Sequence, residues 1–158
     1  MKESQQSYTV KEATIKLMQF CAYRDRCHKE VEEKLREMNM IPAAQEQIIM
    51  ELMQENFLNE ERFARSFVRG KFRIKKWGKI KIKQELKFRE ISAPIIKIAL
   101  TEIDEQKYIA TIYEVAEKKL KLLKEPDKFK KKRKLADFLL RKGYESNLVY
   151  EVANELLE

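Results

Sequence analysis

The chain has 158 residues, of which 44% are hydrophobic, so it can bury a core within the ordinary size of one domain. Its 34 Lys and Arg against 26 Asp and Glu give a formal net charge of +8, which favours a polyanionic partner, nucleic acid first and an anionic membrane surface second. No apolar run approaches the roughly 18 residues that cross a bilayer, and the first ten residues do not resemble a signal peptide. We therefore expect a cytoplasmic protein without a membrane-spanning segment.

Helix is the default prediction along the chain, because only three Gly and three Pro interrupt many residues that form helices well. Apolar residues at three- and four-residue spacing predict helices over 13–24, around 31–38, and from Pro42 to about Gln54. Their expected buried stripes are Ala13, Leu17 and Cys21 with Ile15, Met18 and Ala22; Val31, Leu35 and Met38; and Ala44, Ile48 and Leu52.

A second group of three helices is predicted from Asn59, which is placed as an N-cap before Glu60 and Glu61. Its long first helix is expected to stop near Trp77 and Gly78, where glycine permits a C-terminal cap. The expected buried positions of the three helices are Phe63, Ala64, Phe67, Val68 and Phe72; Ile82 and Leu86; and, after a start at Ser92, Ile95, Ala99 and Ile103.

The same order of helices recurs from Asp104, with a break at residues 125–127 and a helix end at Gly143. The expected buried positions are Ile109, Ile112, Ala116, Leu120 and Leu123; Leu135, Phe138 and Leu139; and, after a start at Ser146, Val149, Val152 and Leu156.

An internal repeat is visible when the second helix of each group is aligned at its C-terminal end. The segments at 34–40, 85–91 and 138–144 each carry a leucine followed five residues later by a large apolar residue. We therefore predict an all-α fold with three tandem three-helix repeats in an elongated, curved array. The predicted divisions are a flexible segment 1–10 and repeats over 11–57, 58–103 and 104–158.

Positive charge is concentrated at one position of the second and third repeats. Residues 71–89 hold nine Lys or Arg and one carboxylate, and residues 118–134 hold ten and two, so the rest of the chain is net negative. Clusters of this size bind phosphates by releasing counterions, weakly and with little regard to sequence. The competing interpretation is that these lysines only solvate helix faces, but Glu and Lys alternate elsewhere and not here.

Aromatic and cysteine residues add little evidence of a site. Three phenylalanines of the first long helix in repeat 2 lie at helical spacing, which favours a core over a base-stacking surface. Trp77 lies at a predicted turn among lysines, and both a core role and a partner-facing role remain open for it. If one helix carried both Cys21 and Cys27, the two would lie about 120° apart around its axis. That separation is too large for an easy disulfide, so we expect free thiols.

Features of catalytic sites are missing from the sequence. The chain has one His, no glycine-rich phosphate loop, no GxSxG motif and four scattered Asp residues without a motif around them. His28 follows Cys27, but no second Cys/His pair exists to complete a zinc site. We therefore expect no enzyme activity, no metal and no cofactor.

The segment over residues 57–92 resembles the central motif of the RecX family of bacterial recombination regulators. The matching residues are Leu58, Glu60, Arg62, Phe63, Ala64, Gly78, Ile82, Glu85 and Leu86, and Arg24, Arg26 and Glu30 match an upstream motif of the same family. The resemblance extends over roughly residues 11–157. The sequence departs from the family pattern at Cys27, where a capping Ser is usual, and at Asn59, which replaces the first residue of an acidic pair.

The resemblance implies a monomeric regulator of RecA that lies in the groove of the RecA filament on single-stranded DNA. It implies restraint of the filament's ATPase, strand-exchange and coprotease activities in recombination, repair and the SOS response. The structural motif residues are expected to be Arg62, Phe63, Ala64, Gly78 and Leu86. The residues expected to contact the partner or single-stranded DNA, weakly and in a salt-dependent manner, are Lys71, Arg73, Lys75, Lys76, Trp77, Lys79, Lys81, Lys83, Lys130, Lys131, Lys132 and Arg133.

Three alternatives predict different behaviour. An independent helix-turn-helix-like DNA-binding regulator prefers a particular duplex sequence. A protein scaffold whose lysines serve solubility has no salt-dependent affinity for DNA. A nuclease, the enzyme alternative, digests DNA when a divalent metal is added.

Overall fold

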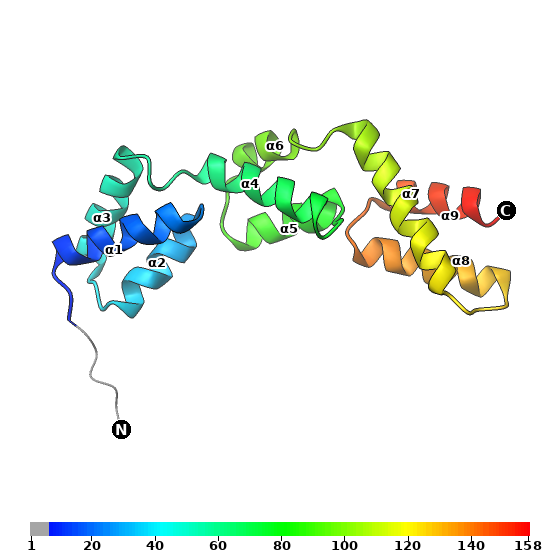
Figure 1. Ribbon diagram of the computed structural model, residues 1–158, viewed down its shortest axis with the longest axis horizontal. Helices are drawn as coiled ribbons and strands as arrows, with labels where there is room; N and C mark the ends of the chain where they lie inside the picture. The colour runs from blue at the N-terminus through cyan, green and yellow to red at the C-terminus, as the bar shows by residue number, and fades with distance from the viewer. Residues whose placement is uncertain (1–6) are drawn as a thin grey trace, which may run out of the picture.

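The structure, a computed structural model, describes residues 7–158, so most of the predicted flexible segment 1–10 lies outside the described residues. Over residues 7–158 the chain forms helices without strands, in three consecutive groups set in an elongated row (Figure 1). The prediction of an all-α fold with three tandem three-helix repeats is confirmed. Repeat 1 contains α1 (Val10–Tyr23), α2 (His28–Glu37) and α3 (Pro42–Gln54); repeat 2 contains α4 (Glu60–Arg73), α5 (Lys79–Phe88) and α6 (Ala93–Leu100); repeat 3 contains α7 (Glu105–Leu122), α8 (Lys128–Arg141) and α9 (Ser146–Leu156).

The first helix of every repeat begins with a side-chain N-cap and packs against the third helix of the same repeat. Thr9 forms a capping box with Glu12 at α1. Asn59 accepts a hydrogen bond from the Arg62 N–H (2.9 Å) at α4, and Asp104 accepts one from the Lys107 N–H (3.0 Å) at α7. These caps satisfy backbone donors that have no partner within the helix, so each repeat starts at a defined residue.

The second helix of every repeat ends in the same turn, which explains the leucine-plus-five pattern of the sequence. Met40, Ile91 and Tyr144 each donate a backbone hydrogen bond to the carbonyl of the leucine five residues earlier, at 3.1, 3.1 and 3.3 Å. The residue before each of them has a left-handed backbone, with φ of 59° at Asn39, 60° at Glu90 and 98° at Gly143. This is the Schellman turn, in which an apolar contact accompanies the bond.

The described residues form two hydrophobic cores of different size. One core belongs to repeat 1 and includes Leu17, Leu35 and Leu52. The other is continuous through repeats 2 and 3, and Cys27 from repeat 1 also packs into it. Repeats 2 and 3 therefore share one buried interior, whereas repeat 1 is attached to it by a narrow contact.

Four predicted core positions, the exposed Ala22 of α1 among them, lie off the most buried side of their helix by a rotation about its axis. Ile96 is buried at 1% exposure in α6, and the predicted Ile95 is only half-buried. Tyr108 is buried in α7 at 1% exposure, and the predicted Ile109 is 39% exposed. Ile15 in α1 is likewise exposed. Since positions next to each other at the edge of an apolar stripe fit the helical spacing equally well, spacing alone did not decide which one faces the core.

The cysteines lie on different elements, which corrects the assumption that one helix carries both. Cys21 is in α1, whereas Cys27 precedes α2, and both are buried free thiols. Burial raises the pKa of both thiols, that of Cys27 to about 11.

Candidate partner interface at the junction of repeats 2 and 3

Two turns meet backbone to backbone where repeat 2 joins repeat 3. The Gly78 N–H donates to the Lys142 carbonyl oxygen (2.8 Å), and the Ile80 N–H donates to the Gly143 carbonyl oxygen (2.9 Å). A Cβ atom placed on Gly78 would lie 2.3 Å from the Gly143 carbonyl carbon, and one on Gly143 would lie 2.3 Å from the Lys81 Cβ. Glycine is therefore required at both positions for this approach.

The predicted role of Gly78 as a helix C-cap is wrong. Helix α4 ends at Arg73, and the residue with a left-handed backbone in the following turn is Lys76, with φ of 58°. Gly78 has φ of −76° and begins α5. Its lack of a side chain serves the contact with repeat 3 and not the end of α4.

Buried tyrosines hold the same junction in place. The Tyr108 ring lies between the rings of Phe72 and Tyr144, with centroid distances of 6.0 and 5.4 Å. Its hydroxyl accepts a hydrogen bond from the Lys79 backbone N–H (3.0 Å) and donates one to Glu145. Burial, followed by the bond to Glu145, raises the pKa of Tyr108, so this hydroxyl remains a donor at neutral pH.

Repeat 3 also holds the turn between α4 and α5, because two of its side chains donate hydrogen bonds to carbonyl groups of that turn. The Tyr144 hydroxyl donates to the Lys76 carbonyl oxygen (2.7 Å), and the Lys142 ammonium donates to the Lys75 carbonyl oxygen (3.0 Å). The turn that carries the predicted basic cluster is thus part of the junction between repeats and does not extend freely into solvent.

Several predicted contact residues already have intramolecular partners. Trp77 is half-buried against the core, and the ammonium groups of Lys71 and Lys81 lie 5.0 and 4.6 Å from its ring. Lys79 forms an ion pair with Glu105 and lies 4.6 Å from the Tyr108 ring. The exposed residues among the predicted contacts of repeat 2 are Arg73, Lys75 and Lys83.

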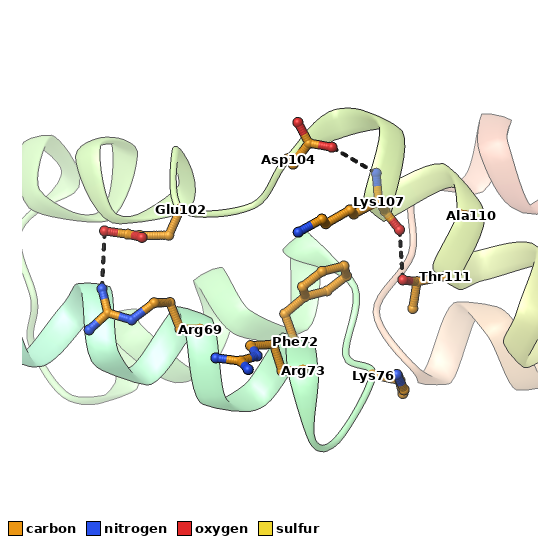
Figure 2. Close-up of a pocket in the computed structure, with 9 residues that line it drawn as sticks. All are labelled: Arg69, Phe72, Arg73, Lys76, Glu102, Asp104, Lys107, Ala110 and Thr111. Atoms are coloured by element: carbon orange, nitrogen blue, oxygen red, sulfur yellow. Dashed lines mark hydrogen bonds and ion pairs between the residues drawn. The ribbon is translucent and has the colours of Figure 1, made fainter.

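A polar cleft of about 630 Å³ opens between α4 and α7 (Figure 2). One wall carries Arg69, Phe72, Arg73 and Lys76, and the opposite side carries Glu102, Asp104, Lys107, Ala110 and Thr111. Arg69 and Arg65 both pair with Glu102, at 3.1 and 2.9 Å, and Asp104 caps α7. Among residues 7–158, Arg73, Lys76 and Lys107 form no ion pair, so three cations border this cleft without a carboxylate of their own.

A second cleft, of about 420 Å³, shares Lys75 and Lys76 with the basic cluster but has an apolar lining. Lys142 borders it, and the pKa of Lys142 is lowered first by burial and then by the positive charges of Lys81 and Lys75. The complete lining of this apolar cleft is Ile74, Lys75, Lys76, Glu114, Val115, Lys118, Lys119, Leu122, Phe138 and Lys142.

Sequence reasoning missed Lys107 and Lys142 as members of the basic surface. Lys142 has a signal in the sequence, because a basic pair precedes Gly143 as Lys75 and Lys76 precede Trp77 and Gly78. Lys107 has no such signal in the sequence, since it lies among acidic residues in the chain. It reaches the polar cleft only because the start of α7 lies across that cleft from α4.

The predicted contact residues of repeat 3 lie in the first half of α8 and line neither cleft. Lys130 and Arg133 are exposed, and Lys131 and Lys132 are half-buried. The structure therefore does not bring this group together with the basic residues of the junction.

The family-motif residues lie in the core of repeat 2 and at the junction between repeats 1 and 2. Phe63, Ala64 and Leu86 are buried in repeat 2. Arg62 donates to Asp25 of repeat 1 (2.7 Å) and to the carbonyl oxygens of Asn56 and Phe57 (both 3.1 Å), which ties repeat 2 to repeat 1.

The upstream motif residues act inside repeat 1. Glu30 accepts hydrogen bonds from Arg24 and Arg26, at 3.0 and 3.4 Å. Arg26 also donates to the Phe20 carbonyl oxygen (3.0 Å) and lies over its ring. These residues connect α1 to α2, so their role in this structure is to hold the turn between the two helices.

These features define a protein of tandem three-helix repeats with a basic surface where repeats 2 and 3 join. Two family models match it: the second three-helix domain of RecX over residues 59–100, and the third three-helix domain of RecX over residues 105–153. The chain belongs to the RecX family. No helix within residues 7–158 is both long and apolar enough to cross a membrane.

Curated relatives agree with this assignment, and solved structures share the fold. A regulatory protein RecX from Clostridium acetobutylicum is 36% identical over 81% of this chain, and one from Bacillus cytotoxicus is 27% identical over 94%. The chain spans 61% and 55% of the length of these relatives. A crystal structure of RecX from Lactobacillus salivarius shares the fold with a TM-score of 0.83, at 24% identity over 93% of this chain and 96% of that one. Another RecX crystal structure has a TM-score of 0.84 at 22% identity over 92% of this chain and 73% of that one.

Proposed function

We propose that this chain binds the filament of RecA on single-stranded DNA and inhibits its ATPase, strand-exchange and coprotease activities. It acts as a regulator by binding, as a monomer and without catalysis of its own. Membership of the RecX family and the regulatory names of the curated relatives support this proposal. The elongated row of repeats offers a long surface to a helical filament (Figure 1).

The observation that carries the proposal is the polar cleft with its three cations. Arg73, Lys76 and Lys107 face a space whose carboxylates are already engaged by other groups. A phosphate group would give these cations partners, and its binding would release counterions and weaken with salt. Contacts of this kind position a protein on nucleic acid without reading its sequence, which suits a regulator that binds along a filament.

The test is hydrolysis of ATP by the RecA of the same organism, titrated with this protein while single-stranded DNA is in excess. We expect inhibition well below one molecule of the regulator per RecA monomer, because binding within a filament affects more than the subunit it touches. Inhibition that begins only when the protein coats the DNA would instead indicate a generic basic DNA-binding protein.

A charge-reversal variant links the activity to the polar cleft. In Arg73→Glu/Lys107→Glu, whose residues line the polar cleft alone, we expect at least a tenfold loss of inhibition, since each lost phosphate contact weakens binding. The matched control is Lys11→Glu/Lys97→Glu, which changes the net charge equally on exposed residues that line neither cleft. Equal losses in the two variants would mean that net charge matters and the cleft does not.

A further inference from the structure

We propose that the apolar cleft binds an acidic segment of a partner protein through one large aliphatic side chain. Two large side chains that line it are strongly exposed: Ile74 at 79% and Leu122 at 69%. Val115 and Phe138 continue this lining beneath them. An apolar anchor placed here would remove these surfaces from water, which is the main source of binding free energy at such sites.

The charge around the cleft selects the chemistry of the segment. Five lysines border the cleft, namely Lys75, Lys76, Lys118, Lys119 and Lys142, against a single carboxylate, Glu114. The pKa of Lys142 is lowered first by burial and then by repulsion from the positive charges of Lys81 and Lys75. Carboxylates that flank the anchor residue would relieve this repulsion, so an acidic sequence on both sides of the anchor fits the rim.

The lining favours a protein segment over a nucleic acid strand. Bases bind single-strand sites by stacking on exposed aromatic faces. The Phe138 ring is half-buried and lies 4.7 Å from the Lys119 ammonium and 5.9 Å from that of Lys142, and the remaining apolar surface is aliphatic. A volume of about 420 Å³ accommodates an aliphatic side chain with its backbone.

This inference goes beyond the proposed function, because it assigns a second class of ligand to a second cleft. The polar cleft binds phosphate in the proposed function, whereas the apolar cleft binds carboxylates and an aliphatic anchor. The two clefts share Lys76. The inference does not depend on RecA, so it is tested with a synthetic peptide and without the recombinase.

The experiment measures the fluorescence anisotropy of a labelled acidic peptide with one central leucine, titrated with the full chain. The same peptide with serine in place of leucine is the ligand control. We expect the leucine peptide to bind at least about tenfold more tightly, as burial of one aliphatic side chain predicts. In Ile74→Ser/Leu122→Ser this preference for leucine should disappear.

The matched control substitution is Ile41→Ser, at another exposed isoleucine (67% exposed) that does not line the cleft. It should leave the affinity for the leucine peptide unchanged. All three substituted residues are exposed, so far-ultraviolet circular dichroism should be the same for all variants.

Equal binding of the leucine and serine peptides, or no binding of either, would overturn the inference. So would a single-stranded oligothymidylate whose affinity falls tenfold in Ile74→Ser/Leu122→Ser, because the cleft would then be a nucleic acid site. The ATPase titration of the proposed function reports on the polar cleft separately, so either claim can fail while the other stands.

Discussion

Repeats 2 and 3 meet through backbone groups and buried rings, whereas repeats 1 and 2 meet mainly through charged side chains. At the first of these junctions Gly78 lies against Gly143, and Tyr108 packs between Phe72 and Tyr144. At the other, Arg62 pairs with Asp25, His28 approaches Glu60 (3.7 Å) and Lys29 donates to the Phe88 carbonyl oxygen (3.1 Å).

The difference between the junctions has consequences for stability. Backbone hydrogen bonds and apolar contacts are little affected by salt, whereas ion pairs of half-exposed side chains are screened by it. The cores follow the same division, because repeats 2 and 3 share one core and repeat 1 has its own. We therefore expect repeats 2 and 3 to unfold together, and repeat 1 to separate from them more readily.

The largest expected effect is that of Gly78→Ala. Its Cβ would lie 2.3 Å from both the carbonyl carbon and the oxygen of Gly143, so the clash is with backbone and cannot be relieved by a side-chain rotation. We expect a loss of about 3 kcal/mol or more in the free energy of unfolding, measured by denaturant titration.

Gly70→Ala is the matched control for that substitution. A Cβ on Gly70 meets nothing within 4 Å, and the residue lies inside α4. We expect a gain of about 0.5–1 kcal/mol, as for alanine replacing glycine in a helix. Similar effects of the two substitutions would contradict the close approach of repeats 2 and 3.

Tyr108→Phe should have the next largest effect. The substitution keeps the ring but removes the hydroxyl that accepts from the Lys79 N–H and donates to Glu145. Unpaired polar groups at a buried site such as this one cost about 1–3 kcal/mol of stability. Tyr113→Phe is the control, because the Tyr113 hydroxyl bonds to Glu155 at the exposed surface, and it should change stability by less than about 0.5 kcal/mol.

Arg62→Ala tests the charged junction. Arg62 is about one-third exposed, so we expect a loss of about 1 kcal/mol, which should shrink as salt is added. The measurement is a denaturant titration at low and high ionic strength. Lys34→Ala removes an exposed pair with Glu37 inside one helix and should lose less than about 0.5 kcal/mol. An effect of Arg62→Ala that does not respond to salt would mean that its bonds to backbone carbonyls dominate.

A last expected effect, confined to alkaline pH, is a loss of stability. Burial raises the pKa of Cys27 from an ordinary value near 9.0 to about 11, so folding favours the protonated thiol. The stability supplied by this group is complete below about pH 9 and is lost as the pH rises toward 11. The free energy of unfolding, measured from pH 8 to 10.5, should fall less steeply in Cys27→Ala. An equal slope in both proteins would show that other groups cause the dependence.

Much of the fold could be predicted from local signals in the chain. Residue type alone indicates two helix starts and one turn, at Asn59, Pro42 and Gly143. Each of these residues acts on the backbone at its own position. The leucine-plus-five pattern recurs because the Schellman turn needs an apolar residue at both positions. The resemblance of residues 57–92 to the central RecX motif then predicted the family, and the two family models confirm that prediction.

The candidate site was predicted only in part. The run of lysines after Lys71 is visible in the sequence, but its division into engaged and free cations is not. Lys79 and Lys81 are held by Glu105 and Trp77, whereas Arg73 borders an open cleft. A run of charges specifies composition, and only the packing of neighbouring helices decides which charges have partners.

By itself, the sequence determined that this chain is helical, repeated and basic at two places in its repeats, because periodicity, capping and charge are local properties. Only the tertiary structure decided which side of a stripe faces the core and why Gly78 is a glycine. It also decided that Lys107 and Lys142, distant in the chain, join the basic surface of repeat 2. The reason is that each of these features depends on contacts between helices that are distant in the chain, such as Lys79 and Tyr108 at 29 positions apart, and such contacts leave no local signal in the sequence.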